Sequence, residues 1–87
     1  MKLTVSTGGE SWDVEADSPM AAFIKAIKTY GFDKIGLIAT ITPTGKPDIT
    51  QGGNEGWIIS TERGLQEAGI EYARTDGGQK MSPVRLQ

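Results

Sequence analysis

The sequence contains neither cysteine nor histidine, and this double absence removes most catalytic chemistry. Without thiols the chain has no disulfide, no thiolate nucleophile and no cysteine metal ligand. Without imidazole it lacks the commonest general base and the commonest metal ligand. Serine–histidine and cysteine–histidine catalytic machinery is therefore excluded. We expect a protein that is not an enzyme and that uses no cofactor and no metal ion.

Apolar side chains are also scarce. Hydrophobic residues occupy 37% of the 87 positions, and Trp, Tyr and Phe occur only twice each. No stretch approaches the roughly 20 consecutive apolar residues that span a bilayer. The first residues carry one lysine, Lys2, but not the apolar segment of a secretion signal. We expect no membrane contact and a cytoplasmic location.

The charge balance is slightly acidic, with nine Lys and Arg against eleven Asp and Glu, a net charge of −2. Proteins that bind nucleic acid by neutralising phosphates usually present a basic surface. We therefore expect no direct binding to nucleic acid. A chain of this length forms one small domain that buries roughly 60–65% of its unfolded surface, so its core is thin.

The N-terminal stretch alternates apolar and polar residues and predicts a β-hairpin. Gly8 and Gly9 can both adopt the positive φ that a type I′ turn requires. Counting outward from this turn pairs Val5 with Trp12 and Leu3 with Val14. The apolar partners then fall on one face of the hairpin, so the turn and the alternation indicate the same register.

A helix follows, for which the sequence supplies both end signals. Ser18 or Asp17 can cap its N-terminus, Pro19 fits its first position, and Gly31 supplies its C-terminal stop. Its expected core-facing side chains recur at helical spacing: Met20, Phe23, Ile24, Ile27 and Tyr30.

The rest of the chain predicts a ββαββαβ order. Residues 34–42 are apolar and β-branched, which indicates a central strand covered on both faces. Residues 56–61 and 70–74 predict two short strands, with a short helix over 62–68 between them. The expected fold class is α+β: a single small domain with an antiparallel or mixed sheet and both helices packed against one face. Residues 1–74 form this domain, and residues 75–87 are expected to be a flexible C-terminal tail.

Two patterns resemble functional motifs, but neither has the features that the motif requires. Asp13 and Glu15 share one face of the predicted hairpin, but we expect that face to be exposed, where carboxyl groups keep ordinary pKa values. Thr44–Gly45–Lys46 resembles part of a phosphate-binding loop. Pro47 follows where that loop needs a hydroxyl residue and a helix, so no phosphate site is expected.

A polar segment over residues 43–56 stands out, because long loops without structure are uncommon in compact domains and tend to be functional. Either it is a mobile loop, or "DITQ" forms an extra strand and the segment is a projecting hairpin arm. Trp57 follows it and is either a core residue or an anchor for a partner. In both cases a rigid sheet presents a polar surface suited to contact another molecule.

The expected partner-binding residues come from this segment and from an acidic stripe on the hairpin. Carboxylates on the second strand could face the basic groove that a target keeps for nucleic acid. The candidate residues are Glu10, Asp13, Glu15, Asp17, Lys46, Asp48, Ile49, Asn54, Glu55 and Trp57.

At "SWDVEADSPMAAFIKAIKTYG" the layout resembles small phage-encoded anti-CRISPR and other anti-defence inhibitors. The resemblance covers residues 2–42 and is one of layout: a hairpin runs into a Ser–Pro helix cap and an alanine-rich helix. It implies a stoichiometric inhibitor of a bacterial nucleic-acid-handling defence complex, acting in the host cytoplasm. The implied partner is a protein or a ribonucleoprotein complex, and no family active site is carried over.

Two other functions remain open. The glycine-rich residues 51–56 could offer backbone amides to a nucleotide or another anion, with Lys46 or Arg63 beside it. Alternatively, the chain could be a virion or assembly protein that forms a homo-oligomer through a sheet edge or through the C-terminal tail.

Overall fold

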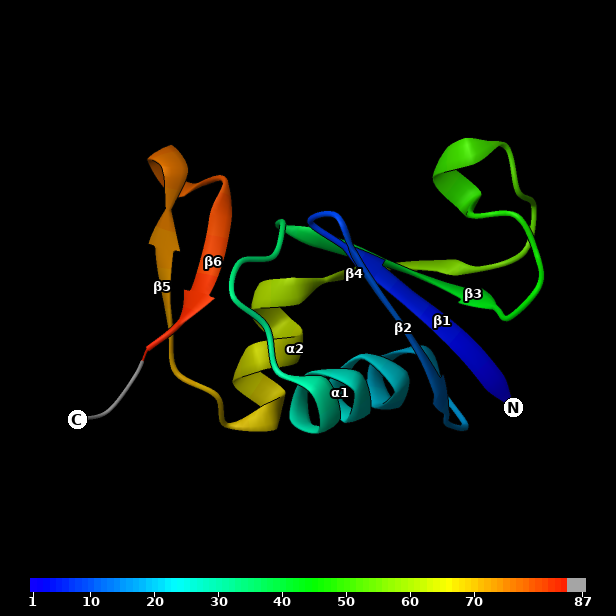
Figure 1. Cartoon of the computed structure of the whole chain (residues 1–87), viewed down its shortest axis with the longest axis horizontal. Coiled ribbons are helices and arrows are strands. Elements are labelled where there is room, and N and C mark those ends of the chain that lie inside the picture. Colours follow the sequence, from blue (N-terminus) through cyan, green and yellow to red (C-terminus); the bar gives the residue numbers. More distant parts are fainter. Residues whose placement is uncertain (85–87) are drawn as a thin grey trace.

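A computed structural model describes residues 1–84 and shows one main sheet, two helices and a small second sheet (Figure 1). The main sheet is antiparallel with strand order β2-β1-β3-β4, and β5 pairs with β6. The elements are β1 (Lys2–Thr7), β2 (Glu10–Glu15), α1 (Pro19–Tyr30), β3 (Ile38–Pro43), η1 (Ile49–Gln51), β4 (Trp57–Ser60), α2 (Thr61–Ala68), β5 (Tyr72–Thr75), η2 (Asp76–Gly78) and β6 (Lys80–Pro83). The predicted α+β class and element order are confirmed.

The N-terminal hairpin has the predicted register. Val5 pairs with Trp12 and Leu3 with Val14, as counted outward from the glycine turn. Gly8 and Gly9 have φ of 58° and 87°, the left-handed values that the turn requires. A side chain at Gly8 would also meet the backbone of Ile35 at 2.8 Å.

Helix α1 begins and ends where the sequence predicts. The Ser18 side chain accepts a hydrogen bond from the Ala21 backbone N–H at 3.2 Å. The Gly31 N–H closes the last turn on the carbonyl of Ile27 at 2.8 Å. The buried face is shifted toward small residues, because Ala22 and Ala26 are buried while Tyr30 is 57% exposed.

Both helices pack against the same face of the main sheet, which we call the inner face (Figure 1). The buried core lies between them and the sheet: Leu3, Val5, Val14, Ala22, Phe23, Ala26, Ile27, Ile35, Ala39, Ile41, Leu65 and Met81. Phe23 lies over Gly64 of α2, where a Cβ atom would approach its ring to 2.5 Å. Gly64 therefore lets α1 and α2 pack closely despite its cost of about 1 kcal/mol in a helix.

Strand β3 departs from the predicted burial on its outer face. Thr40 and Thr42 are buried there, but Ile38 is 51% exposed. The prediction of a strand covered on both faces is therefore wrong at the start of β3. The Ile38 side chain is therefore exposed to solvent beside the polar residues of the outer face.

The C-terminal segment also differs from the prediction. Residues expected to belong to a flexible tail form η2 and β6, and β6 pairs antiparallel with β5. Met81 is fully buried, and its backbone exchanges two hydrogen bonds of 2.9 Å with Ile35. The prediction of a tail starting at residue 75 is wrong for this segment, and residues 85–87 lie outside the described residues.

Candidate functional site

The outer face of the main sheet is the face that α1 and α2 do not cover, and its side chains are mostly polar. Because side chains alternate along strands, the residues paired across it point the same way. Ser11 pairs with Ser6, Ser6 with Thr40 and Thr40 with Ile58. This row crosses all four strands and gives the outer face three hydroxyl groups beside one isoleucine.

Residues 44–56 form an ordered loop that folds back onto this face. Asp48 accepts hydrogen bonds from the backbone N–H and the hydroxyl of Thr50 at 2.8 and 2.7 Å. Its other carboxylate oxygen accepts one from the Thr40 hydroxyl at 2.7 Å, which ties the loop to β3. Further backbone bonds close the loop, including those from Gln51 and Gly53 to the Asp48 carbonyl at 2.9 and 3.0 Å.

The loop therefore matches neither alternative that the sequence left open. "DITQ" forms a short 3-10 turn at η1 rather than an extra strand, and β3 pairs directly with β4 across the base of the loop. Compact loops of this length, closed at the base and packed by their own side chains, are often functional. The loop presents a defined surface beside the sheet.

Acid should loosen this loop. Hydrogen bonds from the Thr50 backbone, the Thr50 hydroxyl and the Thr40 hydroxyl hold the pKa of Asp48 below its ordinary value. The stabilisation of the folded protein by the Asp48 carboxylate is complete above the pKa of Asp in the unfolded chain. It is lost as the pH falls through the lower pKa that Asp48 has in the folded chain. We expect the Thr50 amide NMR signal to shift toward unstructured values below about pH 4, where Asp carboxyls protonate.

The matched variants separate charge from hydrogen bonding. Asp48→Asn keeps an acceptor for the Thr50 amide, so this acid-induced shift should disappear. Asp48→Ala removes the cap and should cost about 1 kcal/mol. An unchanged acid transition in Asp48→Asn would contradict the role assigned to this carboxylate.

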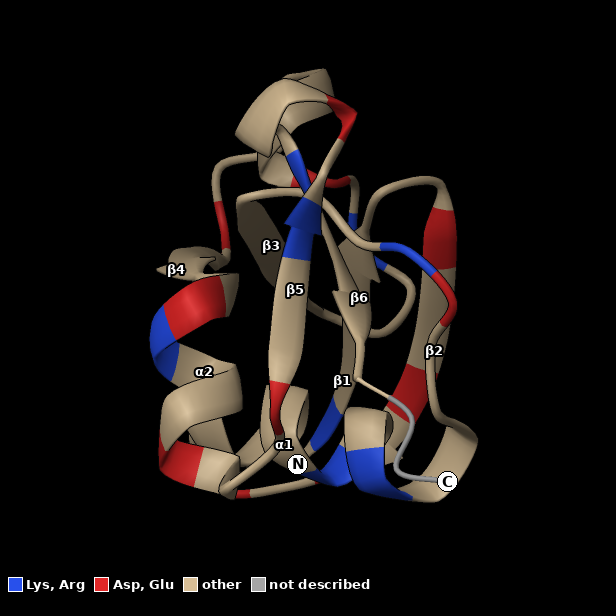
Figure 2. Cartoon of the chain, turned by 90° about the vertical axis from the view of Figure 1, so that its left-hand side faces the viewer, with Lys and Arg blue, Asp and Glu red and all other residues tan. Residues whose placement is uncertain are grey.

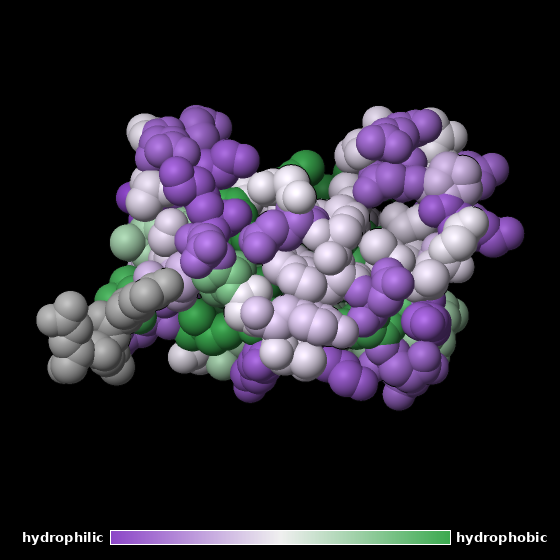
Figure 3. Space-filling model, in the orientation of Figure 1, coloured by the Kyte–Doolittle hydropathy of each residue, from purple (hydrophilic) through white to green (hydrophobic). Residues whose placement is uncertain are grey.

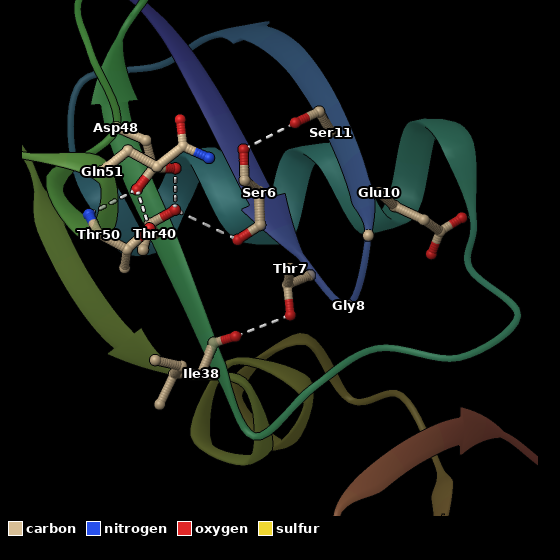
Figure 4. A pocket seen from close by; sticks show the side chains of 11 residues that line it. Ser6, Thr7, Gly8, Glu10, Ser11, Ile38, Thr40, Asp48, Thr50 and Gln51 are labelled. Atoms are coloured by element: carbon tan, nitrogen blue, oxygen red, sulfur yellow. Dashed lines mark hydrogen bonds between the residues drawn. The ribbon is translucent and has the colours of Figure 1, made fainter.

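A hollow of about 390 Å³ lies between the loop and the hairpin turn (Figure 4). Its lining comes from both: Ser6, Thr7, Gly8, Gly9, Glu10, Ser11, Ile38, Thr40, Asp48, Thr50 and Gln51. Most of its hydroxyls already have partners, such as Ser6 with Ser11 at 2.7 Å and Thr7 with the Ile38 carbonyl at 2.7 Å. The lining contains two carboxylates and no cation.

Glu10 lies at the rim of this hollow, and its carboxylate points away from the hydroxyl groups (Figure 4). Burial raises the pKa of Glu10, and the nearby charge of Asp33 raises it further. Its Oε2 atom is buried without a hydrogen-bond partner in the described part of the chain. This carboxylate therefore does not belong to an exposed acidic surface.

The predicted acidic stripe is broken up. By strand alternation Glu10 points to the inner side of β2, while Asp13 and Glu15 point outward. Asp13 accepts a hydrogen bond from the Thr4 hydroxyl at 2.6 Å, and Glu15 pairs with the N-terminal ammonium group at 2.9 Å. That ammonium group lowers the pKa of Glu15. Asp17 follows the strand in an exposed bend, so the four acids form no continuous stripe.

The loop, by contrast, brings its predicted residues together. Lys46, Asn54 and Glu55 are exposed on it and Ile49 is half-buried, while Asp48 is the residue that holds it in place. Trp57 starts the edge strand β4 and is 42% exposed, so the reading of Trp57 as a core residue is wrong.

The sequence reasoning missed two apolar residues on the outer face. Ile38 is 51% exposed and Ile58 is 54% exposed, and they lie diagonally on adjacent strands. Continuous apolar runs hid them, because "LIATI" and "WII" show no alternation that marks one face as exposed. No local pattern in the sequence marks either residue as exposed.

The side of the molecule opposite the helices is hollowed between two hydrophilic projections (Figure 3). One is the loop over residues 44–56, and the other is the β5–β6 hairpin with η2 at its tip (Figure 1). The part of the outer face that we call the floor consists of Ser6, Ser11, Ile38, Thr40 and Ile58. We call this floor and the loop together the outer surface. An apolar pair with a polar rim is the usual composition of a protein-binding patch.

The described residues offer no other obvious chemistry. Among residues 1–84 no group of three or more acidic, histidine or cysteine side chains could hold a metal ion. Within the same residues no helix is long and apolar enough to cross a membrane. No family model, curated protein or solved structure matches the chain, so its function is inferred from the outer surface itself.

Proposed function

We propose that this chain is a non-enzymatic binding protein that captures a protein or a ribonucleoprotein complex through its outer surface. The observation that carries the proposal is the exposure of Ile38 and Ile58 on the outer face of the main sheet. Exposed apolar groups inside a polar rim mark interaction sites. The loop that forms one wall is fixed by Asp48, so binding would order little additional chain.

The proposal also specifies the kind of target. The chain layout over residues 2–42 supports a phage-type, stoichiometric inhibitor of a bacterial nucleic-acid-handling defence complex. The exposed carboxylate of Glu55 on the loop suits a basic target surface. Such charges mainly speed encounter and set orientation, whereas the isoleucines supply the affinity.

A small-molecule function has one observation in its favour, which is the hollow beside the loop. Its volume of about 390 Å³ falls within the range of ligand pockets. Its lining suits an anion poorly, because Glu10 and Asp48 contribute carboxylates and no lysine or arginine lines it. The amides of Gln51 and Gly53 are also engaged within the loop. Macromolecular capture is therefore the better-supported function.

The proposal is tested by capture from a bacterial lysate followed by measurement on the purified complex. Wild type should retain one partner in a 1:1 complex by native mass spectrometry. Ile38→Lys places a charge on the floor of the outer surface and should weaken binding about tenfold or more. Val84→Lys is the matched control, since Val84 is 41% exposed and lies just after β6. Equal affinities for the two variants would contradict the proposed surface.

A further inference from the structure

The main sheet has a free edge at β4, the last strand in the order β2-β1-β3-β4. In Figure 2 this strand lies at the margin of the molecule, with α2 below it and no strand beyond it. Trp57, Ile58 and Ser60 are exposed. Proteins usually protect such an edge with charge, proline or a covering segment, because it can pair with another strand. Strand β4 itself carries no charged residue and no proline.

The direction of the unpaired backbone groups follows from the register. The Thr61 N–H donates to the Leu37 carbonyl at 3.1 Å, just beyond the paired residues Ser60 and Ile38. Hydrogen-bonded and non-hydrogen-bonded pairs alternate along an antiparallel ladder. The backbone groups of Ser60 and Ile58 therefore point away from β3, toward the free edge.

We propose that a second copy of this chain occupies this edge, with the two β4 strands antiparallel about a twofold axis at Ile59. Ile58 of one copy then lies opposite Ser60 of the other, and the outward Ser60 N–H donates to the Ile58 carbonyl. The twofold axis repeats this bond. The Ile58 N–H faces the Ser60 carbonyl, which is also the first acceptor of α2 because Ser60 is the N-cap of that helix. The two main sheets become one continuous sheet.

The occupant is identified by the charges at the ends of the strand. Glu55 is exposed just before β4, and Arg63 is exposed just after it, in the first turn of α2. The twofold pairing brings Glu55 of one copy to the end where Arg63 of the other begins. The Arg63 side chain is 74% exposed and has only a loose contact with Glu67, at 3.8 Å. This arrangement is self-complementary, as a twofold interface requires.

The same pairing explains the apolar residues beside the edge. Ile58 and Ile38 of each copy lie on the outer face next to the new junction, so pairing places two such groups close together. Only the four residues of β4 pair, because α2 begins at Thr61. We therefore expect a weak dimer that forms between micromolar and millimolar concentrations.

Ser60→Pro tests the edge directly. The φ of Ser60 is −76°, which suits proline, and the substitution removes only the outward N–H from the ladder. Ser60 also caps α2 through a 3.3 Å bond from the Arg63 N–H, so Ser60→Ala is the control that loses the cap but keeps the edge N–H. Sedimentation equilibrium should show that Ser60→Ala dimerises like wild type. The dissociation constant of Ser60→Pro should rise about tenfold or more, because each dimer loses two hydrogen bonds.

Amide hydrogen exchange on the free protein supplies a second measurement that does not depend on the proposed function. The Ile58 and Ser60 amides should exchange more slowly at millimolar than at micromolar concentration, while the Gly45 amide on the loop stays unchanged. Three results would each overturn the proposal: a monomer at millimolar concentration, equal dissociation constants for Ser60→Pro and Ser60→Ala, or protection of these amides only by a captured target.

Discussion

Phe23→Ala is expected to destabilise the protein by about 3–5 kcal/mol, the usual cost of deleting a fully buried aromatic ring. Phe23 has no exposed surface and lies where α1 meets α2 and the inner face of the sheet. A domain of 87 residues has roughly 4–13 kcal/mol of total stability, so much of it should be lost. Urea unfolding followed by circular dichroism measures the change.

Tyr30→Ala provides the matched control, because it removes an aromatic ring from the same helix at a position that is 57% exposed. It loses only a long 3.3 Å hydrogen bond from the tyrosine hydroxyl to the Asp13 carbonyl. We expect a cost of about 1 kcal/mol or less. Similar losses for the two variants would mean that α1 is not packed on the face described.

Gly64→Ala should destabilise the wild-type protein but stabilise the Phe23→Ala variant. In the wild-type chain the new methyl group meets the Phe23 ring at 2.5 Å, which should outweigh the gain of about 1 kcal/mol in helix propensity. In the Phe23→Ala chain the methyl group enters the vacated space, so Gly64→Ala should stabilise. A stabilising effect in both backgrounds would rule out the close approach of α1 and α2.

Met81→Ala is expected to cost about 2–5 kcal/mol, as for other buried methionines. Met81 is fully buried and carries β6 onto Ile35, so the side chain joins the small second sheet to the core. Val84→Ala is the control from the same end of the chain, at a residue that is 41% exposed, and should change stability by less than about 0.5 kcal/mol.

Comparing the stabilities of Met81→Ala and Val84→Ala shows whether β6 packs against the core. If Met81→Ala has the small effect expected of Val84→Ala, β6 contributes nothing to the fold. That result would contradict the packing of β6 described above. A large effect for Met81→Ala alone establishes that the folded body continues into β6.

Local chemistry made the first half of the fold predictable. The turn at Gly8 and Gly9 fixes a hairpin register by itself, because slipping it by one residue would turn Val5 away from the core. Ser18 and Gly31 mark the ends of α1 through hydrogen bonds to neighbouring residues. Each of these signals lies within a few residues of the structure it determines.

The misplaced segments depend on contacts that join different elements: Ile35 and Met81 are far apart in the sequence, whereas Thr40 and Asp48 are only 8 residues apart. Strand β6 contains one fully buried residue, Met81, and its partner Ile35 precedes β3. The loop is held by Asp48, whose partner Thr40 lies on a neighbouring strand. Neither pairing leaves a periodic pattern, so the sequence showed only polar residues, glycines and prolines.

The sequence predicted only the loop part of the candidate site, because the rest depends on how the elements pack. The loop was identified by its length and polarity, and five of its predicted residues lie on it: Lys46, Asp48, Ile49, Asn54 and Glu55. The floor was missed, because exposure of Ile38 and Ile58 depends on the sheet having no second layer on that side. The acidic stripe was wrong in composition, since alternation turns Glu10 inward.

Backbone amide exchange of the purified 1:1 complex tests the proposed binding surface most directly. We predict that the captured partner slows exchange in the loop, at the Thr50 and Asn54 amides, and leaves the Lys28 amide on the exposed side of α1 unchanged. Exchange that slows along α1 while the loop amides keep their free-protein rates would contradict binding through the outer surface.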